Sequence, residues 1–202
     1  MSKELIDGYE RKIDYLRLSI TDRCNLRCSY CMPESGVKLL DKKQLLTYEE
    51  LVRIIQIMAG IGIKKIRLTG GEPLLRSDLI SLISRINKIE GIENISLTTN
   101  GILLIEHARR LYDVGVKGLN ISLDSLDPAK YESITRGGRV DKVIHGIDEA
   151  IKIGFESIKI NIVLTNIIDK RDIIDFINFS MKKSLSVRFI EMMPVLNLTD
   201  IE

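Results

Sequence analysis

Hydrophobic residues alternate along the chain between short runs typical of buried strands and longer runs with helical spacing. We expect six strands, at residues 15–20, 65–69, 95–99, 118–123, 158–164 and 187–190. We expect helices with one buried face between them, at residues 48–59, 79–89, 104–114, 143–153 and 173–181. Strands that alternate with helices pair in parallel through right-handed crossovers, so the sequence predicts an α/β fold.

Capping residues support these boundaries. Residues suited to helix entry are Thr47 with Glu50, Ser77, Asp127 before Pro128, and Asp169. Glycines suited to helix ends are Gly60, Gly91, Gly115 and Gly154. The helices are therefore expected to begin and end near these positions.

The number of strand–helix units limits the architecture. A closed eight-unit barrel needs about 250 residues, whereas this chain has 202. We therefore predict one domain, residues 1–202, with six units curved into an open partial (β/α)6 barrel, and an open doubly wound sheet is the alternative. The chain stops soon after the sixth strand, with Pro194 and a polar tail, so we expect a domain that is cut short.

Composition excludes several classes of protein. With 45% hydrophobic residues and 30 Lys and Arg against 28 Asp and Glu, the chain suits a globular core and gives no charge argument for nucleic-acid or membrane binding. The most apolar stretch, residues 51–63, is shorter than the roughly 18 residues of a bilayer span and contains Arg53 and Gln56. The start of the chain lacks the apolar run of a signal peptide, so we expect a cytoplasmic protein.

The cysteines point to a metal centre. There are only three, at Cys24, Cys28 and Cys31, on the loop expected after the first strand. Three thiolates this close suit an iron–sulfur cluster. A fourth iron would lack a protein ligand, which leaves an open site of the kind that catalytic metal centres use. Structural zinc is the alternative, but His107 and His145 lie in or beside helices far away in sequence.

Polar residues follow the other predicted strands. They are Gly70, Gly71, Glu72 and Pro73 after the second strand, residues 99–101 after the third, and Ser122, Asp124 and Ser125 after the fourth. Because the carboxyl ends of parallel strands lie at one edge, these residues are expected to share a site with the cysteines.

Three long cations lie within predicted strands. Arg17, Arg67 and Lys159 are costly to bury unless an anion meets them, so a common inward direction would suit a phosphate-bearing ligand. The alternative is that each points outward as an ordinary surface charge, because strand side chains alternate. A further basic turn, residues 136–139, follows no strand and lacks the P-loop pattern, so we expect it to be flexible.

The combination of motifs resembles the radical S-adenosylmethionine (SAM) superfamily and, within it, the GTP 3′,8-cyclase family of molybdenum cofactor biosynthesis. The superfamily likeness rests on the C-x3-C-x2-C loop with Tyr30 before its last cysteine, followed by Thr69-Gly-Gly-Glu-Pro73. The narrower likeness rests on residues 16–33, 97–101, 120–124 and 188–194. Together these segments extend over essentially the whole chain.

The resemblance implies ligands for each group of residues. It implies a 4Fe–4S cluster on Cys24, Cys28 and Cys31, with SAM bound at the iron that has no cysteine. The SAM contacts that it implies are Tyr30, Gly70, Gly71, Glu72, Thr98, Ser122 and Met193. It makes Arg17 and Arg67 contacts of GTP, and Lys159 a contact of the triphosphate or cofactor region.

The implied reaction removes a hydrogen atom from C3′ of GTP and joins C3′ to C8 of the guanine. A flavodoxin- or ferredoxin-type reductant and a downstream cyclic pyranopterin monophosphate synthase are the implied partners. The family's second cysteine triad and its terminal glycine pair are absent from these 202 residues, so exposed apolar surface and self-association, for example as a homodimer, are expected. A radical SAM enzyme acting on a peptide or other substrate, and an inactive cluster-binding remnant, are the alternatives.

Overall fold

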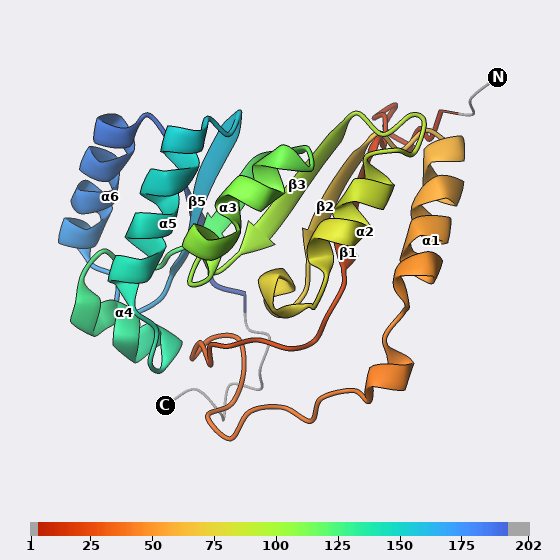
Figure 1. Ribbon diagram of the computed structural model, residues 1–202. Coiled ribbons are helices and arrows are strands. Elements are labelled where there is room, and N and C mark those ends of the chain that lie inside the picture. Colours follow the sequence, from red (N-terminus) through yellow and green to blue (C-terminus); the bar gives the residue numbers. More distant parts are fainter. Residues whose placement is uncertain (1–3, 194–202) are drawn as a thin grey trace.

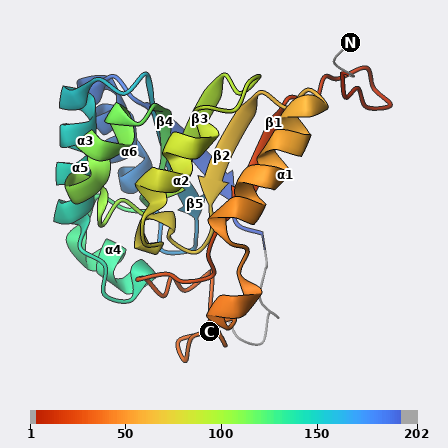
Figure 2. The same cartoon turned by 45° about the vertical axis from the view of Figure 1, so that its right-hand side comes forward.

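A computed structural model describes residues 4–193 and contains one parallel sheet with six strands. The strands are β1 Tyr15–Ser19, β2 Lys65–Thr69, β3 Asn94–Thr99, β4 Val116–Ser122, β5 Ser157–Leu164 and β6 Ser186–Glu191. Their order in the sheet follows their order in the chain, and β1 is not paired with β6. This order confirms an open partial barrel, since a doubly wound sheet reverses its strand order part-way. Figures 1 and 2 show the curved sheet.

Apart from α4, which lies beyond the ends of the strands beside the loop after β1, the helices lie together over one face of the sheet (Figures 1 and 2). They are α1 Tyr48–Gly60, α2 Leu79–Ile86, α3 Leu104–Asp113, α4 Pro128–Thr135, α5 Val140–Ile153 and α6 Lys170–Lys183, with short 3-10 turns η1 Lys42–Gln44 and η2 Pro73–Leu75. The expected helices are confirmed, with two extended at their starts. The helix expected to run to residue 89 ends at Ile86, because Lys88 and Ile89 donate to carbonyls three residues back, as in a tightening final turn.

Most capping predictions are confirmed. Thr47 and Glu50 form a reciprocal capping box, and the side chains of Asp127 and Asp169 cap α4 and α6. The prediction at Ser77 is wrong: α2 begins after Asp78, which has a left-handed backbone (φ 58°), and the Ser77 carbonyl instead accepts a hydrogen bond from Tyr48.

The two faces of the sheet differ in chemistry. On the face that packs against the helices, fully buried apolar side chains form the core, including Ile66, Leu68, Leu97, Leu119, Ile121, Ile160 and Ile162. The intervening residues of the same strands are polar and include Arg17, Arg67, Ser96, Thr98, Asn120, Ser122, Lys159 and Asn161. Barrels of this kind normally fill their interior with branched apolar residues. The polar inner face therefore suits a ligand better than a packed core.

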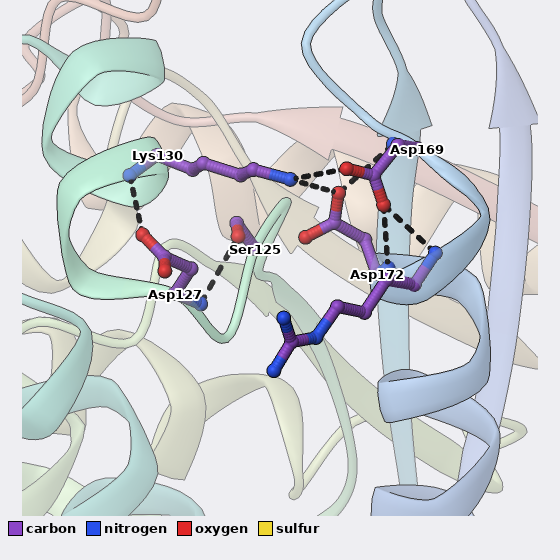
Figure 3. A network of polar contacts seen from close by, with 6 residues as sticks. Ser125, Asp127, Lys130, Asp169 and Asp172 are labelled. Carbon is purple, nitrogen blue, oxygen red and sulfur yellow. Dashed lines mark hydrogen bonds and ion pairs between the residues drawn. The ribbon is translucent and has the colours of Figure 1, made fainter.

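A polar network joins α4 to α6 (Figure 3). Lys130 Nζ contacts Asp169 Oδ2 at 2.9 Å and Asp172 Oδ2 at 2.7 Å, and the Asp172 side chain is nearly buried. Asp127 accepts from the Lys130 backbone and donates its own N–H to Ser125 Oγ. The bond from Lys130, followed by backbone donors at the start of α6, lowers the pKa of Asp169 to about 2. The network fixes α4, which follows β4, against the helix that follows β5.

Replacing Lys130 with Met is expected to lower the melting temperature at neutral pH, because Asp172 loses a charged partner while it stays buried. The pKa of Asp169 lies below its ordinary 3.8 in the folded chain, so its stabilising effect is complete above about pH 4 and is lost as the pH falls towards 2. The difference in melting temperature between the wild type and the Lys130→Met variant should therefore shrink as the pH falls from about 4 towards 2.

The control is Lys182→Met, which removes a cation of α6 that makes no ion pair within residues 4–193. Equal melting curves for the two variants at neutral pH would contradict a stabilising role for Lys130.

Candidate functional site

Three free thiols lie on the loop after β1. Cys24 and Cys28 are half-buried, and Cys31 is exposed. Burial is the main cause that raises the pKa of Cys28, to about 12, and the negative charges of Asp124 and the other two cysteines add to it. The thiols are thus close enough to influence one another and carry the donor chemistry of an iron–sulfur cluster.

A single metal ion fits this loop less well than a cluster. Within residues 4–193, no group of three or more His, Cys, Asp or Glu side chains is placed to hold one ion. In a cluster each thiolate binds a different iron, so the three sulfurs need not converge on one point. His107 belongs to α3 and His145 to α5, so neither is part of the cysteine loop. The arrangement favours a cluster over structural zinc.

The glycine pair after β2 holds the chain that leads into Cys24. Gly71 donates to the Thr21 carbonyl and Glu72 to the Arg23 carbonyl, both at 2.7 Å. A Cβ added to Gly70 would lie 2.4 Å from the Thr21 carbonyl oxygen, and one added to Gly71 would lie 2.3 Å from that of Arg23. Only glycine permits this approach. The two glycines thus position the cysteine loop, and their implied contact with SAM stays a prediction.

The Glu72 side chain is completely buried, with 0% of its surface exposed. Its carboxylate accepts hydrogen bonds from Thr99 Oγ1 (2.8 Å), Asn100 N (2.7 Å) and Leu74 N (3.0 Å). Burial raises its pKa, while these three donors oppose that rise. The carboxylate therefore joins the loops after β2 and β3, and its donors come from the chain itself.

Tyr30 connects the cysteine loop to β4 and β5. Its hydroxyl donates to Asp124 Oδ2 at 2.8 Å, and Asp124 Oδ1 accepts from Val163 N at 2.8 Å. Burial raises the pKa of both Tyr30 and Asp124. This link was not predicted from the sequence, although Asp124 was placed at the end of its strand.

Asn100 is a second residue whose side-chain role the sequence did not reveal. Its amide nitrogen lies 3.9 Å from Cys24 Sγ and 2.8 Å from Asn25 Oδ1. The Asn100 backbone is itself fixed by Glu72. The loop after β3 thus contacts the first cysteine directly.

Several predicted ligand residues line one hollow of about 600 Å³ on the inner face. Arg17, Arg67, Thr98 and Ser122 surround it together with Asn161 and Arg188. Arg188 was not predicted from the sequence as a ligand residue. It is in register with Asn161. The argument that singled out Arg17 and Arg67, a long cation within a predicted strand, also applies to Arg188 in β6 and could have identified it.

Lys159 lies in an adjoining hollow of about 290 Å³, which Arg67 also lines. The Arg67 guanidinium lies 5.0 Å from the centre of the Tyr15 ring. Burial, followed by the positive charges of Arg188 and Arg67, lowers the pKa of Lys159. Within the described chain, Arg67 Nε and Asn120 Oδ1 are buried without a hydrogen-bond partner. Unpartnered buried polar atoms are uncommon, and here they lie beside a hollow that a ligand could fill.

The inner cations lack counter-charges. Within residues 4–193, no ion pair involves Arg17, Arg67, Lys159 or Arg188. By contrast, Lys65 at the start of β2 is paired with Asp14 at 2.8 Å. Cations that share one face, with Arg188 and Arg67 lowering the pKa of Lys159, create a strong attraction for an anion.

Met193 is the predicted ligand residue with the least support from the geometry. It follows β6 directly and 75% of its surface is exposed. Its contact with the adenine of a cofactor stays a prediction. Pro194, which ends the same motif, lies outside the described residues.

Residues 18–180 match the sequence pattern of the Radical SAM superfamily. The chain belongs to this superfamily. Membership implies a 4Fe–4S cluster and SAM, which agrees with the thiol donor set on the loop after β1. No helix within residues 4–193 is long and apolar enough to cross a membrane.

Curated relatives share about half of the aligned sequence. The chain is 49% identical over 189 residues to the GTP 3′,8-cyclase of Alkaliphilus oremlandii and 51% identical over 190 residues to that of Thermodesulfovibrio yellowstonii. Each alignment covers 94% of this chain and 59% of the relative. The chain therefore spans well under two thirds of the length of these proteins.

Solved structures confirm the fold at low sequence identity. The crystal structure of Streptococcus suis SuiB bound to S-adenosylmethionine superposes with a TM-score of 0.79 at 20% identity, covering 94% of this chain and 43% of that one. Methylornithine synthase (PylB) gives a TM-score of 0.72 at 19% identity, with 89% and 53% of the two chains covered.

Replacing Gly71 with Ala is expected to lower the free energy of unfolding by about 1–3 kcal/mol, the usual cost of overpacking. The new Cβ would lie 2.3 Å from a backbone oxygen that cannot rotate away. Urea unfolding of the metal-free chain measures the loss, and iron bound after anaerobic reconstitution should fall in parallel.

Gly60→Ala is the matched control, because nothing lies within 4 Å of the Cβ it would add to the end of α1. Its stability should stay within about 1 kcal/mol of the wild type. If the Gly71 variant unfolded at the same urea concentration as this control, the close packing at Gly71 would be unimportant.

Proposed function

We propose that this chain is the radical SAM core, residues 1–202, of a GTP 3′,8-cyclase. The overall reaction converts GTP to (8S)-3′,8-cyclo-7,8-dihydroguanosine 5′-triphosphate: a hydrogen atom leaves C3′, C3′ bonds to C8, and one electron from the reductant and one proton from solvent complete the dihydro ring. The identity to curated cyclases supports the reaction. The observation that carries the substrate assignment is the set of inner-face cations Arg17, Arg67, Lys159 and Arg188, none of which forms an ion pair within residues 4–193.

The polar inner face suits a nucleoside triphosphate better than a peptide. A triphosphate presents several negative oxygens along a short chain, and guanidinium groups bind such oxygens in pairs. Arg17 and Arg67 are register partners on β1 and β2, and Arg188 lies across the same hollow on β6. A bound triphosphate would give the buried Arg67 Nε the acceptor that residues 4–193 do not supply.

Cys24, Cys28 and Cys31 are the proposed ligands of the 4Fe–4S cluster. When bound, the cluster and SAM supply the 5′-deoxyadenosyl radical that removes the hydrogen atom. The chain's own part is to hold and orient these groups and to keep water away from the reacting carbon. Thr98 and Ser122 face the hollow and offer hydroxyls to the carboxylate or ribose of SAM.

Two predicted SAM residues take more specific roles in this proposal. The Tyr30 hydroxyl is engaged by Asp124, which leaves its ring and backbone for the proposed contact with the adenine. The Glu72 carboxylate is engaged by Thr99 and by two backbone N–H groups, so Glu72 shapes the backbone at Gly70 and Gly71. Met193 completes the proposed set beside the adenine.

The reaction also requires partners. A one-electron reductant of the flavodoxin or ferredoxin type would feed the cluster, and a cyclic pyranopterin monophosphate synthase would consume the product. Self-association as a homodimer stays a prediction, and Phe189 and Ile190 are apolar residues exposed beside the hollow.

The direct test is anaerobic reconstitution with iron and sulfide, followed by reduction with dithionite in the presence of SAM and GTP. The proposal expects 5′-deoxyadenosine whose formation GTP stimulates above the level seen with SAM alone. Cyclised nucleotide in addition would show that these 202 residues suffice for the whole reaction. Deoxyadenosine formation stimulated by a peptide but not by GTP would support the alternative substrate class. No deoxyadenosine from a fully loaded cluster would identify an inactive remnant.

Replacing Arg67 with Ala is expected to weaken GTP binding about 10–100-fold, because a charge-assisted hydrogen bond contributes about 1.5–3 kcal/mol. Deoxyadenosine formed from SAM without GTP should stay near the wild-type level. Arg109→Ala, which removes an exposed arginine of α3, is the control and should leave both quantities unchanged. Wild-type GTP affinity in the Arg67 variant would contradict the substrate assignment.

A further inference from the structure

The turn after α4 differs from the flexible segment that its sequence predicts. Arg136 ends α4 in the left-handed conformation (φ 54°, ψ 60°), and Gly137 follows with φ 110°. Helices that end this way usually place glycine or asparagine at the left-handed position, because a Cβ there is strained. An arginine at this position therefore suggests that its side chain has a role beyond ending the helix.

The Arg136 side chain reaches the cysteine loop. Its Nη1 donates to the carbonyls of Arg27 (3.2 Å) and Met32 (3.0 Å), which lie 109 and 104 positions away in the sequence. Arg27 immediately precedes Cys28, and Met32 immediately follows Cys31. One guanidinium thus bonds to both ends of the segment that carries two of the three thiols.

Backbone hydrogen bonds reinforce the same contact. Arg27 N donates to the Thr135 carbonyl at 3.1 Å, and Ser29 N donates to the Ile134 carbonyl at 2.9 Å. These acceptors are carbonyls at the end of α4, where the helix itself leaves them without partners. The N–H groups of the cysteine loop and the free carbonyls at the end of α4 therefore satisfy each other's hydrogen-bonding capacity.

The turn itself is tightly packed. Thr135 Oγ1 donates to the Tyr131 carbonyl and accepts from Gly138 N at 2.9 Å. A Cβ added to Gly138 would lie 2.4 Å from Thr135 Oγ1. At its other end, α4 is joined to α6 through Lys130 (Figure 3). The helix is thus anchored at both ends.

We propose that Arg136 is a positioning residue of the cluster site, which holds the Cys28–Cys31 segment in its ligating conformation before a cluster is assembled. By donating hydrogen bonds to two backbone carbonyls, the Arg136 guanidinium keeps this short loop folded while its thiols are unligated. The inference rests on the cluster that membership of the superfamily implies. It does not depend on GTP as the substrate, so the two proposals can fail separately.

The test compares two substitutions with opposite backbone preferences. Arg136→Gly removes the side chain and relieves the left-handed strain, whereas Arg136→Met keeps the strain and the aliphatic stem but has no donor. Arg139→Gln is the control, because Arg139 in the same turn bonds only to Asp141 among the described residues.

The readout is hydrogen–deuterium exchange of residues 27–32 in the metal-free full chain, together with its melting temperature and the iron bound after reconstitution. Both Arg136 variants are expected to exchange at least tenfold faster in this segment, as for the loss of a charge-assisted bond. They should also bind less iron, while the Gly variant melts at or above the wild-type temperature. The control should match the wild type.

Wild-type exchange in both variants would overturn the proposal and leave Arg136 as a simple helix end. If residues 27–32 exchanged at the wild-type rate in the Gly variant and faster only in the Met variant, the cause would be backbone strain at position 136. The proposal would then also fail. If faster exchange extended equally through α5 and the sheet, the defect would be global instead of local, which contradicts a positioning role.

Discussion

Side chains of a parallel strand point alternately to its two faces, and the site depends on this constraint. In β1 to β5 most residues at one parity are apolar and pack against the helices, while most at the other parity are polar and line the inner hollows. A slip of one residue in β1, β2 or β5 would bury the inner cation of that strand in the core and expose its isoleucines or leucines. The packing of the helices on the apolar face therefore also determines that Arg17, Arg67 and Lys159 point to the inner face.

The cysteine loop is fixed from several directions by groups that belong to other loops. Gly71 and Glu72 bind the chain that enters it, Tyr30 joins it to Asp124, and the end of α4 binds the segment of Cys28. These contacts all lie at the carboxyl edge of the sheet, next to the inner hollow. The fold thus places thiols suited to an electron-carrying cluster beside a cationic surface suited to a phosphorylated substrate.

Local patterns predicted the parts of this molecule that depend on local chemistry. Strand and helix periods predicted all six strands, and the spacing of Cys24, Cys28 and Cys31 predicted a shared site. The occupied carboxylate of Glu72 and the contact of Arg136 could not be predicted in this way, because their partners are set by the meeting of loops distant in sequence. The sequence alone does not distinguish Arg136 from an ordinary surface arginine, because its contacts form only when α4 lies beside the cysteine loop.

The central claim is that the inner face is a binding surface for a polyphosphate. Calorimetric titration of inorganic tripolyphosphate into the metal-free chain tests it most directly, since neither cluster nor SAM is needed. The account predicts binding that weakens steeply as salt rises, that GTP displaces, and that is lost when Arg17 and Arg188 are both replaced by Ala. Binding that is absent at low salt, or that persists unchanged in the double variant, would contradict it.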